Sequence, residues 1–105
     1  MIRVECTKKD NKIIKLFVLG HAESAEYGKD LVCAGTSTVI FGGLNNLKEI
    51  EKFSIEKDED KGLIKIEALR DVNMHDYIVL ETIMVQLKTI EKQYSSYIKV
   101  IEKGC

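Results

Sequence analysis

Apolar residues alternate with polar ones over residues 2–8, a period of two that is typical of a β-strand with one buried face. A polar turn at residues 9–12 follows, and residues 13–19 are rich in side chains that favour strands. The two segments therefore predict a β-hairpin, whose second strand ends at Gly20. Residues 20–29 have no strong period, and we predict that they form a loop.

Apolar residues then recur at helical spacing from Leu31 to about Lys52. Asp30, directly before this stretch, is interpreted as the N-cap, because its carboxylate can accept a hydrogen bond from a free amide of the first turn. Each glycine inside the stretch costs a helix about 1 kcal/mol relative to alanine. Their presence predicts close packing against a neighbouring element; these glycines are Gly35, Gly42 and Gly43.

A second alternation of apolar and charged residues begins at Phe53 and resumes over residues 64–68, on either side of a charged turn at residues 57–62. This pattern predicts a second hairpin. The acidic run Asp58-Glu59-Asp60 is interpreted as part of a solvated turn. The alternative is that it attracts a basic partner.

A second helical stripe runs from Asn73, the predicted N-cap, to about Tyr94. Residues 97–101 predict a short last strand, which gives the order ββαββαβ. Paired strands separated by single helices favour an α+β fold in which two helices pack on a mainly antiparallel sheet. A length of 105 residues predicts a single domain, residues 1–105.

The charge balance is close to neutral, with 16 basic and 17 acidic residues and a net charge of −1. We therefore expect no direct nucleic acid binding and no attraction to an anionic membrane. No apolar stretch reaches the roughly 18 residues needed to span a bilayer. The N-terminus lacks the features of a signal peptide, which predicts a cytoplasmic protein. The three scattered cysteines indicate neither a disulfide framework nor a metal site.

Candidate chemistry is concentrated at His21 and Cys33, each flanked by small residues. The thiolate is the reactive form of cysteine. With the helix predicted to begin after Asp30, Cys33 falls in the first turn, where the helix dipole favours negative charge and free amides could bind an oxyanion. His21 could form an ion pair with the thiolate and protonate a leaving amine. Spacing alone is a weak signal, because most helical cysteines are buried small hydrophobes.

Two neighbours could support this pair. Ser37 lies four residues after Cys33, so the two side chains share one helix face, and its hydroxyl could orient the imidazole or the substrate. Asp30 has two possible roles, as the helix cap or as the third member of a triad that orients His21.

The other cysteines and the second histidine have simpler interpretations. Cys6 continues an inward-facing strand pattern and is predicted to lie in the core. Cys105 is predicted to be exposed and oxidisable. His75, at the start of the second predicted helix, is an alternative base, although solvent exposure is the simpler expectation.

The motif residues, taken together, resemble those of the ribosomal-processing cysteine protease family (Prp). They are Gly20-His21-Ala22, Gly28, Asp30, Val32-Cys33-Ala34 and Ser37. The resemblance extends over the whole chain, including its length and its order of elements. One departure is visible: Gly35 and Thr36 stand where the family usually has a small residue and then an aliphatic one.

The resemblance implies a cytoplasmic cysteine endopeptidase that removes the N-terminal extension of a large-subunit ribosomal protein through an acyl-enzyme. It implies that Cys33 is the nucleophile and His21 the general base, with Asp30 and Ser37 supporting the site. The loop between His21 and Asp30 would cover an extended substrate, with Gly20 and Gly28 as hinges. The resemblance also implies a homodimer that needs no metal or cofactor.

Two other functions are compatible with the sequence. One is a non-catalytic ribosome-assembly factor that binds a ribosomal protein or RNA, for which the clustered motif would be a coincidence. The other is a redox-sensing thiol protein, which would need a resolving cysteine near Cys33, and Cys6 is the internal candidate.

Overall fold

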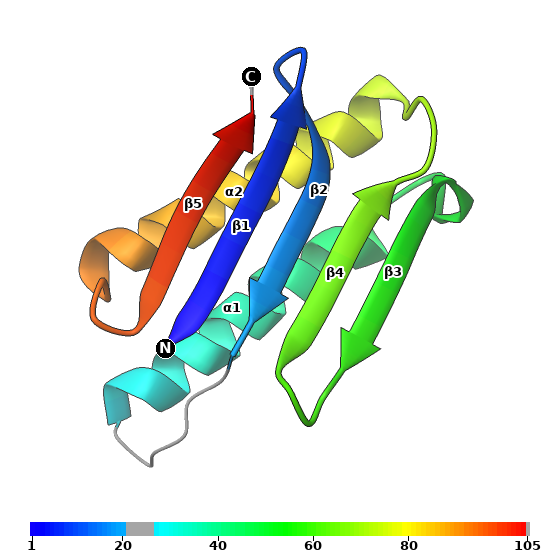
Figure 1. Cartoon of the computed structure of the whole chain (residues 1–105). Helices are drawn as coiled ribbons and strands as arrows, with labels where there is room; N and C mark the ends of the chain where they lie inside the picture. The colour runs from blue at the N-terminus through cyan, green and yellow to red at the C-terminus, as the bar shows by residue number, and fades with distance from the viewer. Residues whose placement is uncertain (21–26, 105) are drawn as a thin grey trace.

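The computed structural model describes residues 1–20 and 27–104 of the chain. Its elements follow the predicted ββαββαβ order, with one short 3₁₀ helix added (Figure 1). They are β1 (Ile2–Lys9), β2 (Lys12–Leu19), α1 (Tyr27–Asn45), η1 (Ile50–Lys52), β3 (Phe53–Asp58), β4 (Leu63–Ala68), α2 (Met74–Gln93) and β5 (Ile98–Gly104). The α+β fold predicted from the sequence is confirmed.

The five strands form one sheet in the order β3-β4-β2-β1-β5. Three of the four neighbouring pairs are antiparallel, and β5 runs parallel to β1. Lys9 pairs with Lys12 across the β1–β2 turn, and the two residues between them, Asp10 and Asn11, have φ of 53° and 64°. Aspartate and asparagine tolerate this left-handed conformation better than most residues, so the two-residue turn suits the hairpin.

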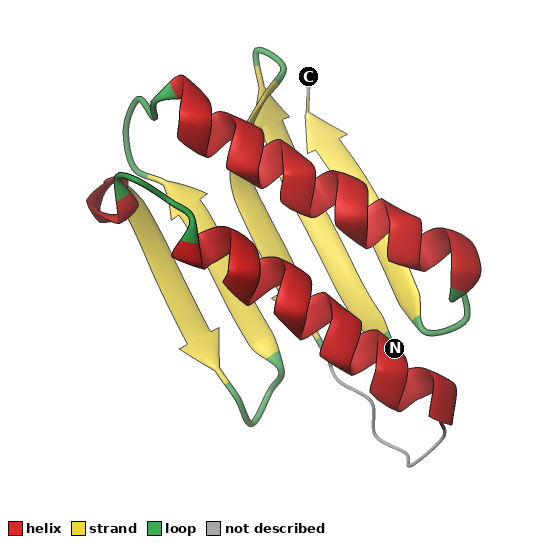
Figure 2. Ribbon diagram, turned by 180° about the vertical axis from the view of Figure 1, so that it is seen from behind, coloured by secondary structure: helices red, strands yellow, loops and turns green. Residues whose placement is uncertain are grey.

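Both helices cover the same face of the sheet, as Figure 2 shows, while the other face is open to solvent in Figure 1. Alternate residues of β1 point into the layer between sheet and helices, and Cys6 is fully buried there. This burial confirms the predicted core role of Cys6, and it raises the pKa of the thiol. In the described part of the chain, neither helix is long and apolar enough to cross a membrane.

The two helices pack closely against each other at Gly43 of α1. A Cβ built on this residue would overlap the side chain of Ile83 on α2, so the close-packing interpretation holds there. The close-packing interpretation is wrong for Gly42, where an added Cβ would have nothing within 4 Å. At Gly35 an added Cβ would make only an ordinary van der Waals contact with Ile90. Two adjacent glycines point in different directions from a helix, and only one can face its neighbour.

The end of α1 differs from its prediction, since the helix stops at Asn45 instead of continuing to about Lys52. The cause lies on α2, where the carboxylate of Asp76 accepts hydrogen bonds from the backbone amides of Lys48 and Glu49, both at 2.9 Å. These contacts hold the connection after α1 in a non-helical path. They span 27 and 28 residues of sequence, so periodicity near Lys52 carries no trace of them.

Asp76 is fully buried within a polar network at the start of α2. Asn73, the predicted N-cap, accepts from the amide of Asp76, and His75 lies with its Nδ1 2.8 Å from the Asp76 carboxylate. Burial alone would raise the pKa of Asp76. The hydrogen bonds from Lys48, His75, Glu49 and Asn73 outweigh it and lower the pKa to about 2.

The start of α1 also differs from its prediction. The helix begins at Tyr27, so Asp30 lies inside it and is not the N-cap, and Gly28 lies in the helix instead of a covering loop. An acidic residue is favourable both as a cap and within the first turn, where it faces the positive end of the helix dipole. The same local signal therefore fits two helix starts that differ by one turn. Residues 21–26 of the predicted loop lie outside the described residues.

Candidate active site

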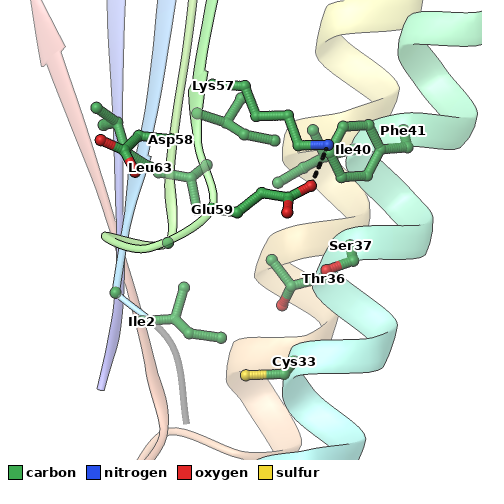
Figure 3. Close-up of a pocket in the computed structure, with 14 residues that line it drawn as sticks. Ile2, Cys33, Thr36, Ser37, Ile40, Phe41, Lys57, Asp58, Glu59 and Leu63 are labelled. Atoms are coloured by element: carbon green, nitrogen blue, oxygen red, sulfur yellow. Dashed lines mark ion pairs between the residues drawn. The ribbon is translucent and has the colours of Figure 1, made fainter. Parts of the chain in front are cut away.

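A cavity of about 290 Å³ lies between α1 and the β3–β4 hairpin (Figure 3). Its floor is apolar and comes mainly from the sheet, with Ile2, Val18 and Ile64 among the lining residues. Cys33, Thr36 and Ser37 line it from α1, whereas Asp58 and Glu59 line it from the hairpin turn. A mostly apolar hollow with a few polar groups on its wall is the usual form of a ligand site.

Cys33 is partly exposed on the α1 side of this cavity. It is the seventh residue of α1, so the prediction that it lies in the first turn is wrong. Backbone amides of the second turn already have partners within the helix, and the effect of the helix dipole fades beyond the first turn. A reactive thiolate at Cys33 must therefore be favoured by nearby side chains and not by the end of the helix.

Ser37 and Thr36 follow Cys33 along the same wall of the cavity. Ser37 is exposed, and its place beside Cys33 agrees with the shared helix face expected from the four-residue spacing. Thr36 is 4% exposed, and its hydroxyl has no hydrogen-bond partner in the part of the chain that the structure describes. In Figure 3 the Thr36 side chain points from α1 toward the cavity, between Cys33 and Ile40.

On the hairpin wall, the side chain of Lys57 reaches across to α1 (Figure 3). Its Nζ lies 3.0 Å from a carboxylate oxygen of Glu59 and 4.9 Å from the centre of the Phe41 ring. The cation over the aromatic face links the hairpin to the helix, and both side chains line the cavity. Sequence reasoning missed this contact, because nothing local connects residues 41 and 57.

The acidic run at residues 58–60 lies at the hairpin turn, as predicted, with Asp58 as the last residue of β3 and Glu59 and Asp60 in the turn itself. The Asp58 carboxylate accepts from the backbone amides of Asp60 and Lys61 at 3.1 and 3.3 Å, while the Glu59 and Asp60 side chains are exposed. The prediction did not foresee that Asp58 and Glu59 also line the cavity that holds Cys33.

Gly20 brings the end of β2 to the same cavity. Its φ is 104°, and a Cβ at this position would lie 2.5 Å from the carbonyl oxygen of Met1. Only glycine adopts this conformation without strain. The Gly20 amide donates to the Gly62 carbonyl at 3.1 Å, so the residue that precedes His21 is held against the hairpin. His21 itself lies outside the described residues.

His75 lies far from this cavity. The residue after it, Asp76, binds the backbone at Lys48 and Glu49, beyond the C-terminal end of α1. Cys33 lies twelve residues before the last residue of α1, which is roughly 18 Å along a helix. The alternative in which His75 acts as the base for Cys33 is therefore wrong. The described residues also contain no group of three or more His, Cys, Asp or Glu placed to hold a metal ion.

Comparison with known proteins identifies the family. The family model for the cysteine protease Prp matches residues 1–99. The chain belongs to this family. The resemblance seen in the motif around His21 and Cys33 is thereby confirmed, and so is the class of enzyme, a cysteine protease involved in ribosomal protein processing.

Known Prp proteins resemble the chain over nearly its whole length. The ribosomal processing cysteine protease Prp of Staphylococcus aureus strain Mu50 is 36% identical over 103 residues, covering 95% of this chain and 97% of the relative. Crystal structures of S. aureus Prp with a substrate peptide and with a covalently linked product peptide have TM-scores of 0.85 and 0.84, at 34% and 35% identity. Each comparison covers 98% of this chain and 100% of the other.

Proposed function

We propose that this Prp-family protease removes the N-terminal extension of a large-subunit ribosomal protein, with Cys33 as nucleophile and His21 as general base. The observation that carries the proposal is the cavity whose wall contains both Cys33 and Gly20, the residue before His21. The S. aureus relative supports it further, because that Prp has been crystallised with a substrate peptide and with a covalently linked product peptide.

The proposed reaction has two stages. The Cys33 thiolate attacks the scissile carbonyl, the C–N bond breaks, and the imidazolium of His21 donates a proton to the departing amine. This leaves the extension peptide joined to Cys33 as a thioester. His21 then removes a proton from water, the hydroxide attacks the thioester carbonyl, and the extension leaves with a free carboxylate while the thiol is restored. No metal or cofactor takes part in this proposal.

Asp30 and Ser37 have supporting roles in this proposal. Because α1 begins at Tyr27, Asp30 is not the N-cap of the helix. In this proposal its carboxylate orients the imidazole of His21. Ser37 lines the cavity beside Cys33, so its hydroxyl can contact either the imidazole or the substrate. Gly20 is retained as the hinge of the segment that carries His21.

Cleavage of a synthetic peptide tests the proposal directly. The peptide carries the N-terminal extension of the ribosomal protein and several residues beyond the cut, and mass spectrometry identifies the products. We expect the wild-type protein to cut at one bond and the Cys33→Ala and His21→Ala variants to be inactive. Cys6→Ala is the matched control, because Cys6 is buried away from the cavity, and it should retain activity.

The same peptide separates the protease from the non-catalytic assembly factor. A binding factor would leave the peptide uncut, and its Cys33→Ala variant would bind ribosomal protein as well as the wild type does. Equal cutting by the wild type and Cys33→Ala would likewise contradict the assignment of the nucleophile.

Alkylation by iodoacetamide tests the pairing of Cys33 with His21 without a substrate. An imidazolium beside Cys33 would stabilise the reactive thiolate, so we expect iodoacetamide to modify Cys33 well below pH 8. His21→Ala should lose this low-pH reaction. Cys6 provides the internal comparison, because burial raises the pKa of its thiol, and peptide mapping distinguishes the two modified sites.

We also propose that the protein is a homodimer that pairs through the outer face of α2. Three apolar side chains share this face at helical spacing and are 52–68% exposed: Met74, Ile78 and Val85. Such a stripe fits a self-complementary contact about a two-fold axis. Sedimentation should give a dimer for the wild type and a monomer for Ile78→Glu/Val85→Glu; a wild-type monomer at micromolar concentration would contradict the proposal.

A further inference from the structure

The Thr36 hydroxyl is a buried polar group on the wall of the Cys33 cavity, and it has no hydrogen-bond partner among residues 1–20 and 27–104. A buried hydroxyl normally has a partner, because removing it from water without one is unfavourable. Even the other threonines of the two described helices, which are exposed, have hydroxyl partners. Their hydroxyls donate to the carbonyl four residues earlier, each at 2.8 Å: Thr38 to Ala34, Thr82 to Ile78 and Thr89 to Val85.

Thr36 has the same local option, the carbonyl of Val32, and does not use it. Thr36 and Ile40 are consecutive buried residues of α1 along the cavity, and Ile40 provides no polar atom. The unpartnered oxygen thus belongs to a wall that is otherwise apolar at this depth, whereas the hydroxyl of Ser37 is already exposed to water.

We propose that Thr36 is a substrate-positioning residue whose hydroxyl forms a hydrogen bond with the main chain of the bound peptide. The inference rests on the proposed function of Cys33. Residues three apart on a helix have Cβ atoms about 5–6 Å apart, and an extended peptide advances about 3.3 Å per residue. The Thr36 partner is therefore a main-chain group within about two residues of the scissile bond.

A main-chain partner suits the chemistry of this position. A hydroxyl donates and accepts, so it serves either the carbonyl or the amide of an extended peptide, and each peptide group brought into the apolar cavity needs such a partner. Threonine here is also a departure from the aliphatic residue expected from the family resemblance. The hydroxyl is thus a feature of this chain's own substrate site.

Peptide binding in a Cys33→Ala background tests the proposal without cleavage. Adding Thr36→Val removes the hydroxyl and keeps the shape, and we expect the dissociation constant of the fluorescently labelled extension peptide to rise about tenfold. Adding Thr36→Ser keeps the hydroxyl and should restore binding to within about twofold of the background. Equal affinity for the Thr36→Val and Thr36→Ser proteins would overturn the proposal, as would failure of the background protein to bind the peptide.

Kinetics with Cys33 intact separate this role from catalysis. Loss of a contact that is equal in the ground and transition states raises KM and leaves kcat nearly unchanged, so we expect Thr36→Val to raise KM about tenfold. An unchanged KM contradicts the role of Thr36 while cleavage by Cys33 still stands. Cleavage by Cys33→Ala would instead contradict the proposed function, whatever Thr36 does.

Altered peptides identify the partner group. Peptides in which each polar side chain near the cut is replaced by alanine should retain the full difference between Thr36→Val and wild type, because their main chain is intact. Disappearance of the difference with one such peptide would show that Thr36 binds a side chain and would overturn the main-chain assignment.

Discussion

Thr36 and Asp76 are both buried polar residues on helices, and their surroundings are opposite. Asp76 is fully buried, and its carboxylate is surrounded by donors from Lys48, Glu49, Asn73 and His75. Thr36 is buried almost as deeply, and its hydroxyl has no hydrogen-bond partner among the described residues. The first arrangement fixes the connection between two helices, whereas the second leaves a polar atom facing a cavity.

The Asp76 carboxylate thus stabilises the fold, whereas the Thr36 hydroxyl is available to a ligand. A fully paired buried network rigidifies its surroundings, and an unpaired group is unfavourable until something binds to it. We therefore expect substitutions around Asp76 to change mainly the free energy of unfolding. Substitutions at Thr36 and Gly20 should, whatever they do to stability, also change how the protein binds or cuts its peptide.

The largest effect on stability should come from Asp76→Ala. This change leaves the amides of Lys48 and Glu49 without their acceptor and removes the partner of His75, so we expect a loss of about 3 kcal/mol in the free energy of unfolding. Urea denaturation followed by circular dichroism measures it. Asp58→Ala is the matched control, because Asp58 also accepts from two backbone amides but at an exposed turn, and it should lose less than about 1 kcal/mol.

Gly20→Ala should cause the next largest loss of stability, because it places a Cβ against the Met1 carbonyl at a residue with positive φ. We expect a loss of about 2 to 3 kcal/mol in stability and a lower kcat/KM, since the residue before His21 must move. Gly42→Ala is the control, since its Cβ would have nothing within 4 Å, and it should stabilise α1 by about 0.5 to 1 kcal/mol. Equal behaviour of the two variants would contradict this account of Gly20.

Acid should weaken the Asp76 network specifically. The pKa of Asp76 is lowered from 3.8 to about 2 in the folded protein, so its stabilising contribution is present above pH 4 and is lost as the pH falls from about 4 toward 2. The contribution is roughly 2 kcal/mol. Denaturation curves of the wild type and Asp76→Asn should converge over this interval, because other carboxylates titrate in both proteins. A constant difference down to pH 2 would contradict the assignment.

The smallest effect, opposite in sign, should come from Thr36→Val. Removing a buried hydroxyl that has no partner should raise the free energy of unfolding by about 1 kcal/mol, and thermal or urea unfolding measures it. Thr38→Val is the control, because Thr38 is exposed and already bonded to Ala34, and it should change stability by less than about 0.5 kcal/mol. Destabilisation by Thr36→Val would show that the hydroxyl has a structural partner in solution.

The sequence predicted the elements whose signals are local. Alternation gave the strands, and Asn73 marked the start of α2 because an N-cap bonds within its own first turn. The end of α1 escaped prediction because it depends on Asp76, 28 residues beyond Lys48. The start of α1 was predicted wrongly because aspartate is favourable at more than one position near a helix N-terminus. Taking Asp30 as the cap placed the start of the helix one turn too late.

In the candidate site, too, only the features that depend on local spacing could be predicted. The spacing of Cys33 and Ser37 predicted their common wall, because four residues make about one helical turn. The opposite wall could not be predicted, since Lys57 approaches Phe41 only after the hairpin docks on α1. The polar character of Thr36 was visible as a departure from the family, but its burial and its unpartnered hydroxyl required the packed structure.

The parallel pairing of β1 with β5 has a consequence for the protein's own synthesis. Ile2 contributes to the floor of the Cys33 cavity, and its neighbour across the β1–β5 ladder is Ile98. Until the ribosome has translated residues 98–104, β1 is an outer strand with unpaired amide and carbonyl groups along one side. A nascent chain that has already produced Cys33 therefore still lacks β5, the strand that pairs with β1 along the side opposite β2 and holds Ile2 within the sheet.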